Sequence, residues 1–154
     1  MDLEGGCFCG SIRYRISGPV SHETNCHCSI CRRTSGAPFV AWLTVAPRDF
    51  SWTTTAPSEF QSSDHGRRTF CPRCGTPLTF RSSALPDEVD LTICSLDDPE
   101  RVPPRDHTRT SARLSWVETD GSRPAYREER GEGAEGRGEG PERRVEEPES
   151  TPDR

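Results

Sequence analysis

The 154-residue sequence contains no lysine, and all 20 of its Lys/Arg-type charges are arginine. Catalysis through a lysine Schiff base is therefore excluded. Methionine occurs once and apolar residues make up only 30% of the chain. Packing alone would therefore give marginal stability, and we expect metal cross-links to stabilise the fold as well. The sequence has no apolar run that could cross a bilayer and no basic, apolar signal segment at its start. We therefore expect a cytoplasmic protein with no membrane partner.

Charge of one sign is concentrated near the C-terminal end. Residues 128–154 carry 10 Asp or Glu and 5 Arg, which accounts for the whole formal net charge of −5. Residues 1–127 are therefore neutral, so we expect no nucleic-acid partner. Residues 131–154 are rich in Gly, Glu and Arg, and we expect them to form a disordered acidic tail after one folded domain at residues 1–130.

The sequence also lacks the apolar spacing that a long helix requires. Only a short helical turn after Cys28, reaching Arg33 or Thr34, is expected. Short apolar or alternating segments separated by turns with Pro or Gly predict a mainly β domain. The predicted strands cover residues 11–17, 39–45, 50–53, 59–62, 67–70, 78–81 and 89–94.

Cysteine, by contrast, is abundant and clustered. Seven of the eight cysteines lie within residues 7–9, 26–31 and 71–74. In a reducing compartment such clusters favour metal ligation over disulfides, and zinc is the expected ion. Four thiolates complete a tetrahedral site, whereas three leave one position open to a substrate. Two pairs and one triplet can therefore form one structural zinc site and one reactive zinc site.

The motif Cys71-Pro72-Arg73-Cys74-Gly75 has the spacing of a zinc knuckle, with Pro72 stiffening the turn and Gly75 permitting the twist after it. A redox pair is the alternative, but it requires the start of a helix in a βαβ setting, which the sequence does not predict. Cys7 and Cys9 can supply two further ligands, because residues two apart on a strand face the same side. The alternative for them is a pair of buried free thiols.

Cys26, Cys28 and Cys31 place three sulfurs within six residues. The fourth position at an ion held there would belong to water, to a substrate or to a distant side chain, and in the last case the zinc would be structural. His27 is expected to lie beside the ion or at the surface, pointing away from the ligands. The distant candidates for the fourth ligand are Cys94, His22, His65 and His107.

Less specific expectations concern single residues near these motifs. Cys94 ends an apolar run and is expected to be a small buried residue. Arg32 and Arg33 follow the triplet and could either attract a carboxylate-bearing substrate or be ordinary solvated charges. Core positions rather than pocket positions are expected for Phe39, Trp42 and Trp52.

Taken together, these motifs resemble the glutathione-dependent formaldehyde-activating family, which shares its domain type with centromere protein V. The resemblance implies a β-tent fold, in which antiparallel sheets are pinned by two zinc ions. At one position the chain departs from the pattern, with Cys94 where we expect glycine. The resemblance is carried by residues 5–10, 12–14, 26–33, 36–39, 70–78, 95–99, 103–104, 107 and 111–116. By this resemblance the structural zinc ligands would be Cys7, Cys9, Cys71 and Cys74, and the catalytic zinc ligands would be Cys26, Cys28 and Cys31.

The activity implied by the resemblance is that of a carbon–sulfur lyase, which adds a glutathione-like thiol to formaldehyde or another small aldehyde. The expected partners are thus a small thiol and a small aldehyde. His107 and His27 are the candidates for the proton donor to the developing alkoxide. A second class of function remains open, in which the chain is a non-catalytic, zinc-stabilised β scaffold that binds another protein.

Overall fold

The structure is a computed structural model that describes residues 1–119 and 121–130, so the tail expected at 131–154 lies outside the described residues. Within that part of the chain, ten strands form two β-sheets, accompanied by one α-helix and short 3₁₀ turns. The prediction of a mainly β domain is confirmed. No helix among the described residues is long and apolar enough to span a membrane.

The smaller sheet has three antiparallel strands in the order β1 (Asp2–Gly6), β2 (Arg13–Ser17) and β5 (Phe50–Trp52). The larger sheet is mixed rather than antiparallel throughout, because its edge strand β10 runs parallel to β3. Its seven strands lie in the order β10 (Asp106–Thr108), β3 (Ser21–Cys26), β4 (Val40–Val45), β9 (Leu85–Thr92), β8 (Pro77–Ser82), β7 (Gly66–Phe70) and β6 (Ser58–Gln61).

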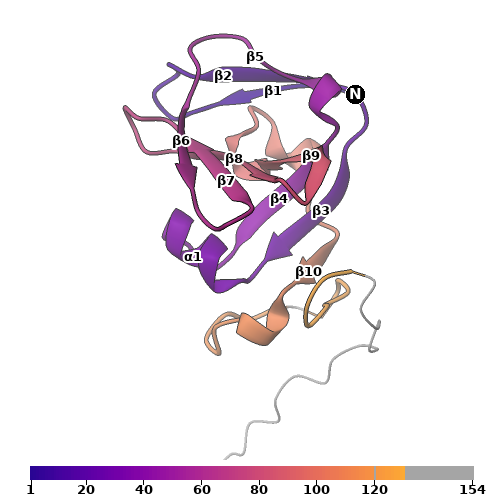
Figure 1. Cartoon of the computed structure of the whole chain (residues 1–154). Helices are drawn as coiled ribbons and strands as arrows, with labels where there is room; N and C mark the ends of the chain where they lie inside the picture. The colour runs from indigo at the N-terminus through magenta and orange to yellow at the C-terminus, as the bar shows by residue number, and fades with distance from the viewer. Residues whose placement is uncertain (120, 131–154) are drawn as a thin grey trace, which may run out of the picture.

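The larger sheet is covered differently on its two faces. Figure 1 shows β1, β2 and β5 above it, and the single helix α1 (Ser29–Ser35) below it. The segment that follows β10 lies beyond α1 at the bottom of the same view. The four 3₁₀ turns are η1 (Pro47–Asp49), η2 (Ile93–Ser95), η3 (Pro99–Arg101) and η4 (Thr110–Ala112).

Side-chain alternation on the central strands divides the packing into two clusters. Leu43 pairs with Leu91 in register and packs with Tyr14 and Ile16 of the smaller sheet, forming the main core. Trp42, the residue before Leu43, faces the other way and forms a second cluster with Val40 and Cys31 of α1. The cysteine-bearing helix therefore covers the face of the larger sheet that the smaller sheet leaves free.

The strand predictions are confirmed in part. All seven predicted segments overlap an observed strand, but β1, β3 and β10 were not expected. The expected helical turn is a seven-residue α-helix, which Cys28 caps at its start and Gly36, at φ +67°, caps at its end. Helix α1 is short enough that packing, rather than periodicity in its sequence, must stabilise it.

Candidate functional site

Four cysteines from two distant turns meet between the sheets. Cys7 and Cys9 lie in the turn after β1, and Cys71 and Cys74 lie in the turn between β7 and β8. Their Sγ atoms all lie within 4.8 Å of one another. The expectation that Cys7 and Cys9 lie on a strand is wrong. They converge instead because the chain reverses there, with Gly10 at φ +75° and its N–H donating to the Cys7 carbonyl oxygen at 3.0 Å.

Hydroxyl groups lie close to these sulfurs, and the pKa values of Cys7 and Cys74 are lowered whereas that of Cys9 is raised. The Ser11 hydroxyl lies 3.1 Å from Cys9 Sγ and 3.5 Å from Cys71 Sγ. Thr76 Oγ1 lies 3.2 Å from Cys74 Sγ, and this hydrogen bond lowers the pKa of Cys74 to about 5. Burial opposes ionisation of Cys7, but hydrogen bonds from the Ile12 N–H and from Ser11 outweigh it and lower the Cys7 pKa to about 7. Deprotonated sulfurs in this arrangement are the ligand form that soft metal ions prefer.

The setting of Cys71 and Cys74 also bears on the redox alternative. Both lie on a turn between antiparallel strands, and Cys71 is completely buried. A thioredoxin-like redox pair lies at the start of a helix, whereas the chain passes from this turn directly into β8. Every cysteine of the chain is free of disulfides.

Cys26, Cys28 and Cys31 form the second group, built where a strand passes into a helix. Cys26 ends β3, Cys28 is the N-cap of α1, and Cys31 lies in the first helical turn. Their Sγ atoms lie within 4.8 Å of one another, and no fourth Cys, His, Asp or Glu of the described residues joins the group. The Cys31 N–H donates to Cys28 Sγ at 3.2 Å. Hydrogen bonds from Cys26 and Cys31 lower the pKa of Cys28, so negative charge is favoured on this sulfur.

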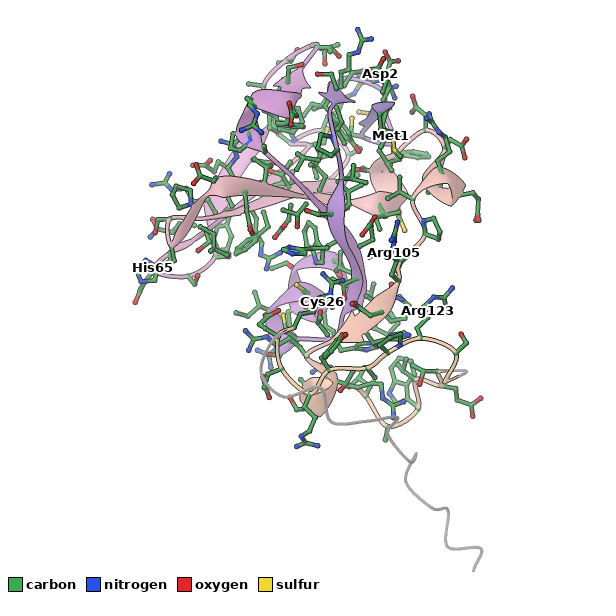
Figure 2. All side chains as sticks on the ribbon, turned by 90° about the vertical axis from the view of Figure 1, so that its right-hand side faces the viewer. Met1, Asp2, Cys26, His65, Arg105 and Arg123 are labelled. Atoms are coloured by element: carbon green, nitrogen blue, oxygen red, sulfur yellow. The ribbon has the colours of Figure 1, made fainter. Side chains whose placement is uncertain are left out.

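None of the distant candidate ligands belongs to this group. Cys94 is exposed on η2, so the expectation that it is buried is wrong. His22 is exposed at the start of β3. Figure 2 shows His65 at the tip of the hairpin that projects from the sheet, far from Cys26 beside α1. His107 lies instead against another histidine.

His27 and His107 form a buried pair. His27 is fully buried, and its Nε2 lies 2.9 Å from His107 Nδ1. The surface position considered for His27 is therefore wrong. Burial, together with the neighbouring His107, lowers the pKa of His27 to about 4, so this ring is neutral at pH 7. The backbone N–H of His27 also donates to the Thr108 carbonyl oxygen at 3.0 Å, which fixes the backbone between Cys26 and Cys28 against β10.

A cavity of about 320 Å³ lies between α1 and the larger sheet, and although none of the three cysteines lines it, Arg68 on its wall contacts Cys31. Thr34 and Ser35 of α1 line one wall, and Trp42, Arg68 and Phe60 of the larger sheet line the other. Trp42 is buried as expected, but it also lines this cavity, so the core-only expectation for it is wrong.

Arg68 connects the cavity to the sulfurs and was not singled out by the sequence. Its Nη2 donates to Cys31 Sγ at 3.6 Å. Only the register of β7 reveals this proximity, because it places Arg68 opposite Phe80 and Phe60 on the face that α1 covers. The two arginines that the sequence did single out differ: Arg32 is half-buried whereas Arg33 is exposed.

The two groups differ in what they can do chemically. Each could hold a metal ion, since both consist of converging sulfur ligands. The four-cysteine group would satisfy a tetrahedral ion by itself, whereas the three-cysteine group would leave a coordination position for an external ligand.

Comparison with known proteins shows which family this chain resembles in sequence. The model of the family described as glutathione-dependent formaldehyde-activating enzyme matches residues 2–112. A Halomonas elongata protein provisionally named as such an enzyme is 32% identical over 129 residues, covering 78% of this chain and 82% of that protein. An uncharacterized lyase of Schizosaccharomyces pombe is 30% identical over 79 residues, covering 51% of this chain and 57% of that protein.

One solved structure supports the fold alone. The crystal structure of a Rhodobacter sphaeroides protein superposes with a TM-score of 0.52 at 24% identity. The match covers 62% of this chain and 88% of that one. Both cysteine groups lie inside the segment that the family model matches.

Proposed function

The chain belongs to the glutathione-dependent formaldehyde-activating enzyme family, and from this premise we propose that it is a zinc-dependent carbon–sulfur lyase. In the proposed reaction a glutathione-like thiol adds to formaldehyde or another small aldehyde and gives an S-hydroxymethyl-type adduct. The observation that carries the proposal is the group of three converging sulfurs without a fourth protein ligand among the described residues, beside a cavity of about 320 Å³.

The ligands fit zinc at both groups. Thiolate sulfur is a preferred zinc ligand, and the four-cysteine set is that of a structural site. We assign Cys7, Cys9, Cys71 and Cys74 to structural zinc, and Cys26, Cys28 and Cys31 to the catalytic ion. When bound at the second group, zinc would supply the positive charge that keeps a substrate thiol deprotonated near pH 7.

The proposed reaction forms a C–S bond and an O–H bond, and it breaks the S–H bond of the thiol and the π bond of the carbonyl. The thiolate sulfur adds to the carbonyl carbon, the C=O π electrons move to oxygen, and the oxygen takes up a proton. The protein contributes chiefly by holding thiol and aldehyde together, since the two already combine in water. Cleavage of the adduct follows the same path in reverse.

We propose His107 for the proton transfer, acting through its hydrogen bond to His27. His27 lies between Cys26 and Cys28 in the sequence, and His107 lies on β10, which pairs with β3 where that strand ends at Cys26. The proposed domain spans residues 1–130, and the proposed location is the cytoplasm, where thiols stay reduced. Neither a nucleic acid nor a membrane has a part in this function.

The test compares the purified zinc-loaded chain with its Cys28→Ser variant. Serine is also a good N-cap, so this change removes a sulfur ligand while α1 keeps its cap. Elemental analysis should find two zinc ions in the wild type. Exchange NMR of glutathione with formaldehyde should show faster adduct exchange than in free solution, and Cys28→Ser should return the rate to that of free solution.

Cys94→Ser is the matched control, because it makes the same chemical change at an exposed cysteine outside both groups. This variant should exchange as fast as the wild type. A folded, two-zinc wild type without any rate enhancement would refute the lyase for this substrate pair and favour the non-catalytic scaffold. Full activity in Cys28→Ser would refute the assignment of the site.

A further inference from the structure

The side chain of Arg68 is held in a fixed orientation beside the three-cysteine group. Its guanidinium carbon lies 4.6 Å from the centroid of the Phe80 ring and 5.7 Å from that of Trp42. Contacts of this kind with aromatic faces orient the planar guanidinium. Its Nη2 donates to Cys31 Sγ at 3.6 Å, so one edge of the group is directed at the sulfurs.

The remaining donors of Arg68 have no acceptor within the part of the chain that the structure describes. Among residues 1–119 and 121–130, no carboxylate forms an ion pair with Arg68, and Nε is buried without a hydrogen-bond partner. Arg67, the preceding residue, makes a useful contrast. Its Nη1 donates to Glu59 at 2.6 Å and its side chain is 60% exposed. A half-buried arginine with unused donors at a cavity wall is suited to bind an anion that the protein itself does not supply.

The cavity lies between α1 and strands of the larger sheet. Thr34 and Ser35 form its helical side, Phe60 stands at β6, and Gly75 follows Cys74 in the knuckle turn. It therefore lies between the two cysteine groups. A volume of about 320 Å³ is at the small end of the range for pockets that hold organic ligands. Its mixed hydroxyl and aromatic walls suit a peptide-like chain better than a bare aldehyde.

We propose that Arg68 binds a carboxylate of the thiol substrate and thereby fixes how that substrate lies in the cavity. The substrate chain would lie along the cavity against Trp42 and Phe60, with its sulfur directed at the three-cysteine group. This inference rests on the proposed function and names the residue that orients the thiol. A planar guanidinium can bind a carboxylate through two parallel hydrogen bonds, which fixes the orientation of the substrate as well as its charge.

The test uses S-methylglutathione, a thioether with two carboxylates that has no thiol to ionise. Its binding to the zinc-loaded protein, measured by calorimetry, reports on the cavity and not on the reaction. The wild type should bind this acid about tenfold or more tightly than it binds the dimethyl ester, which carries no carboxylate. Arg68→Met should abolish the preference for the acid, and Arg68→Lys should restore only part of it, because lysine keeps the charge but loses the planar fork.

Arg67→Met is the matched control. It removes the same charge from the adjacent residue, whose guanidinium is ion-paired and exposed, and it should keep the preference of the wild type. Zinc content and circular dichroism would show that each variant is loaded and folded. If the wild type binds acid and ester equally or binds neither, the inference is overturned, and this result needs no variant. Retention of the preference in Arg68→Met would overturn it as well.

These outcomes separate the inference from the function on which it rests. Faster adduct exchange without any preference for the acid would overturn the role of Arg68 and leave the lyase in place. A preference for the acid that depends on Arg68, without faster exchange, would support carboxylate binding in the cavity and refute the lyase.

Discussion

Asp90 shows how its surroundings change the charge state of a single side chain in this fold. The residue lies on β9, where it accepts a hydrogen bond from Thr44 Oγ1 at 2.6 Å. Burial raises the pKa of Asp90 from 3.8 to about 6, against the opposing effect of that hydrogen bond. Since the folded-state pKa is above the unfolded value, the folded chain binds the proton more tightly. Asp90 therefore favours folding at low pH, and this contribution is lost as pH rises from about 4 through 6.

Asp90→Asn keeps the acceptor for Thr44 but cannot ionise. Relative to the wild type, we expect its free energy of unfolding to increase between pH 4 and 6 and to stay about 3 kcal/mol higher above pH 6. Urea unfolding curves at a series of pH values measure this difference. Asp87→Asn, at an exposed position on the same strand, should follow the wild type. A pH-independent difference for Asp90→Asn would contradict the account.

The cysteines illustrate which residue-level features could be predicted from the sequence. The local spacing predicted clusters of metal ligands, and the family resemblance predicted their division into the groups of four and three sulfurs that converge in the structure. The exposure of Cys94 could not be predicted, since its apolar neighbours suggested a strand where the chain turns into η2. Arg68 was also missed, because its position depends on strand register and on where α1 packs.

Among the elements, β1 is held close to the η2 turn by a residue without a side chain. Gly5 pairs with Tyr14 on β2 and bridges Leu96 on its other side. A Cβ at this position would lie 2.4 Å from the Tyr14 hydroxyl oxygen and 2.5 Å from the Ser95 carbonyl oxygen. The Tyr14 hydroxyl is itself bonded to Ser95 Oγ at 2.7 Å, so neither neighbour can move without breaking a buried contact.

Gly5→Ala should therefore destabilise the chain, by about 1–3 kcal/mol as overpacking commonly does. The midpoint of urea unfolding of the zinc-loaded protein measures the effect. Glu4→Ala, at the adjacent exposed position on β1, should change stability by no more than about 0.5 kcal/mol. Stability of Gly5→Ala equal to that of the wild type would show that β1 is not confined in this way.

The elements that the sequence did not predict are those stabilised by distant partners. Strand β3, with the sequence SHETNC, is polar throughout, yet Glu23, Thr24 and Asn25 are buried. Their environment comes from β10, more than 80 residues further along, as the 3.1 Å contact between Thr24 Oγ1 and Thr108 Oγ1 shows. The predicted strands, by contrast, were mostly those with an apolar face toward a core, such as β4.

At the scale of the whole molecule, the two cysteine groups differ in what they connect. The four-cysteine group joins the turn after β1 to the turn between β7 and β8, so it links the two sheets across 62 residues from Cys9 to Cys71. The three-cysteine group closes only six residues, from Cys26 to Cys31. An ion at the first group would thus stabilise the chain, whereas the second group can accept and release ligands without separating the sheets.

This division is the central claim, and cadmium-113 NMR of the cadmium-loaded chain tests it most directly, since each thiolate site gives its own resonance. Two resonances are expected. Added glutathione should shift only the one that is missing in Cys28→Ser, because only the three-cysteine group has a position for an external sulfur. The account would be contradicted if glutathione shifted neither resonance, or if it shifted the resonance of the four-cysteine group.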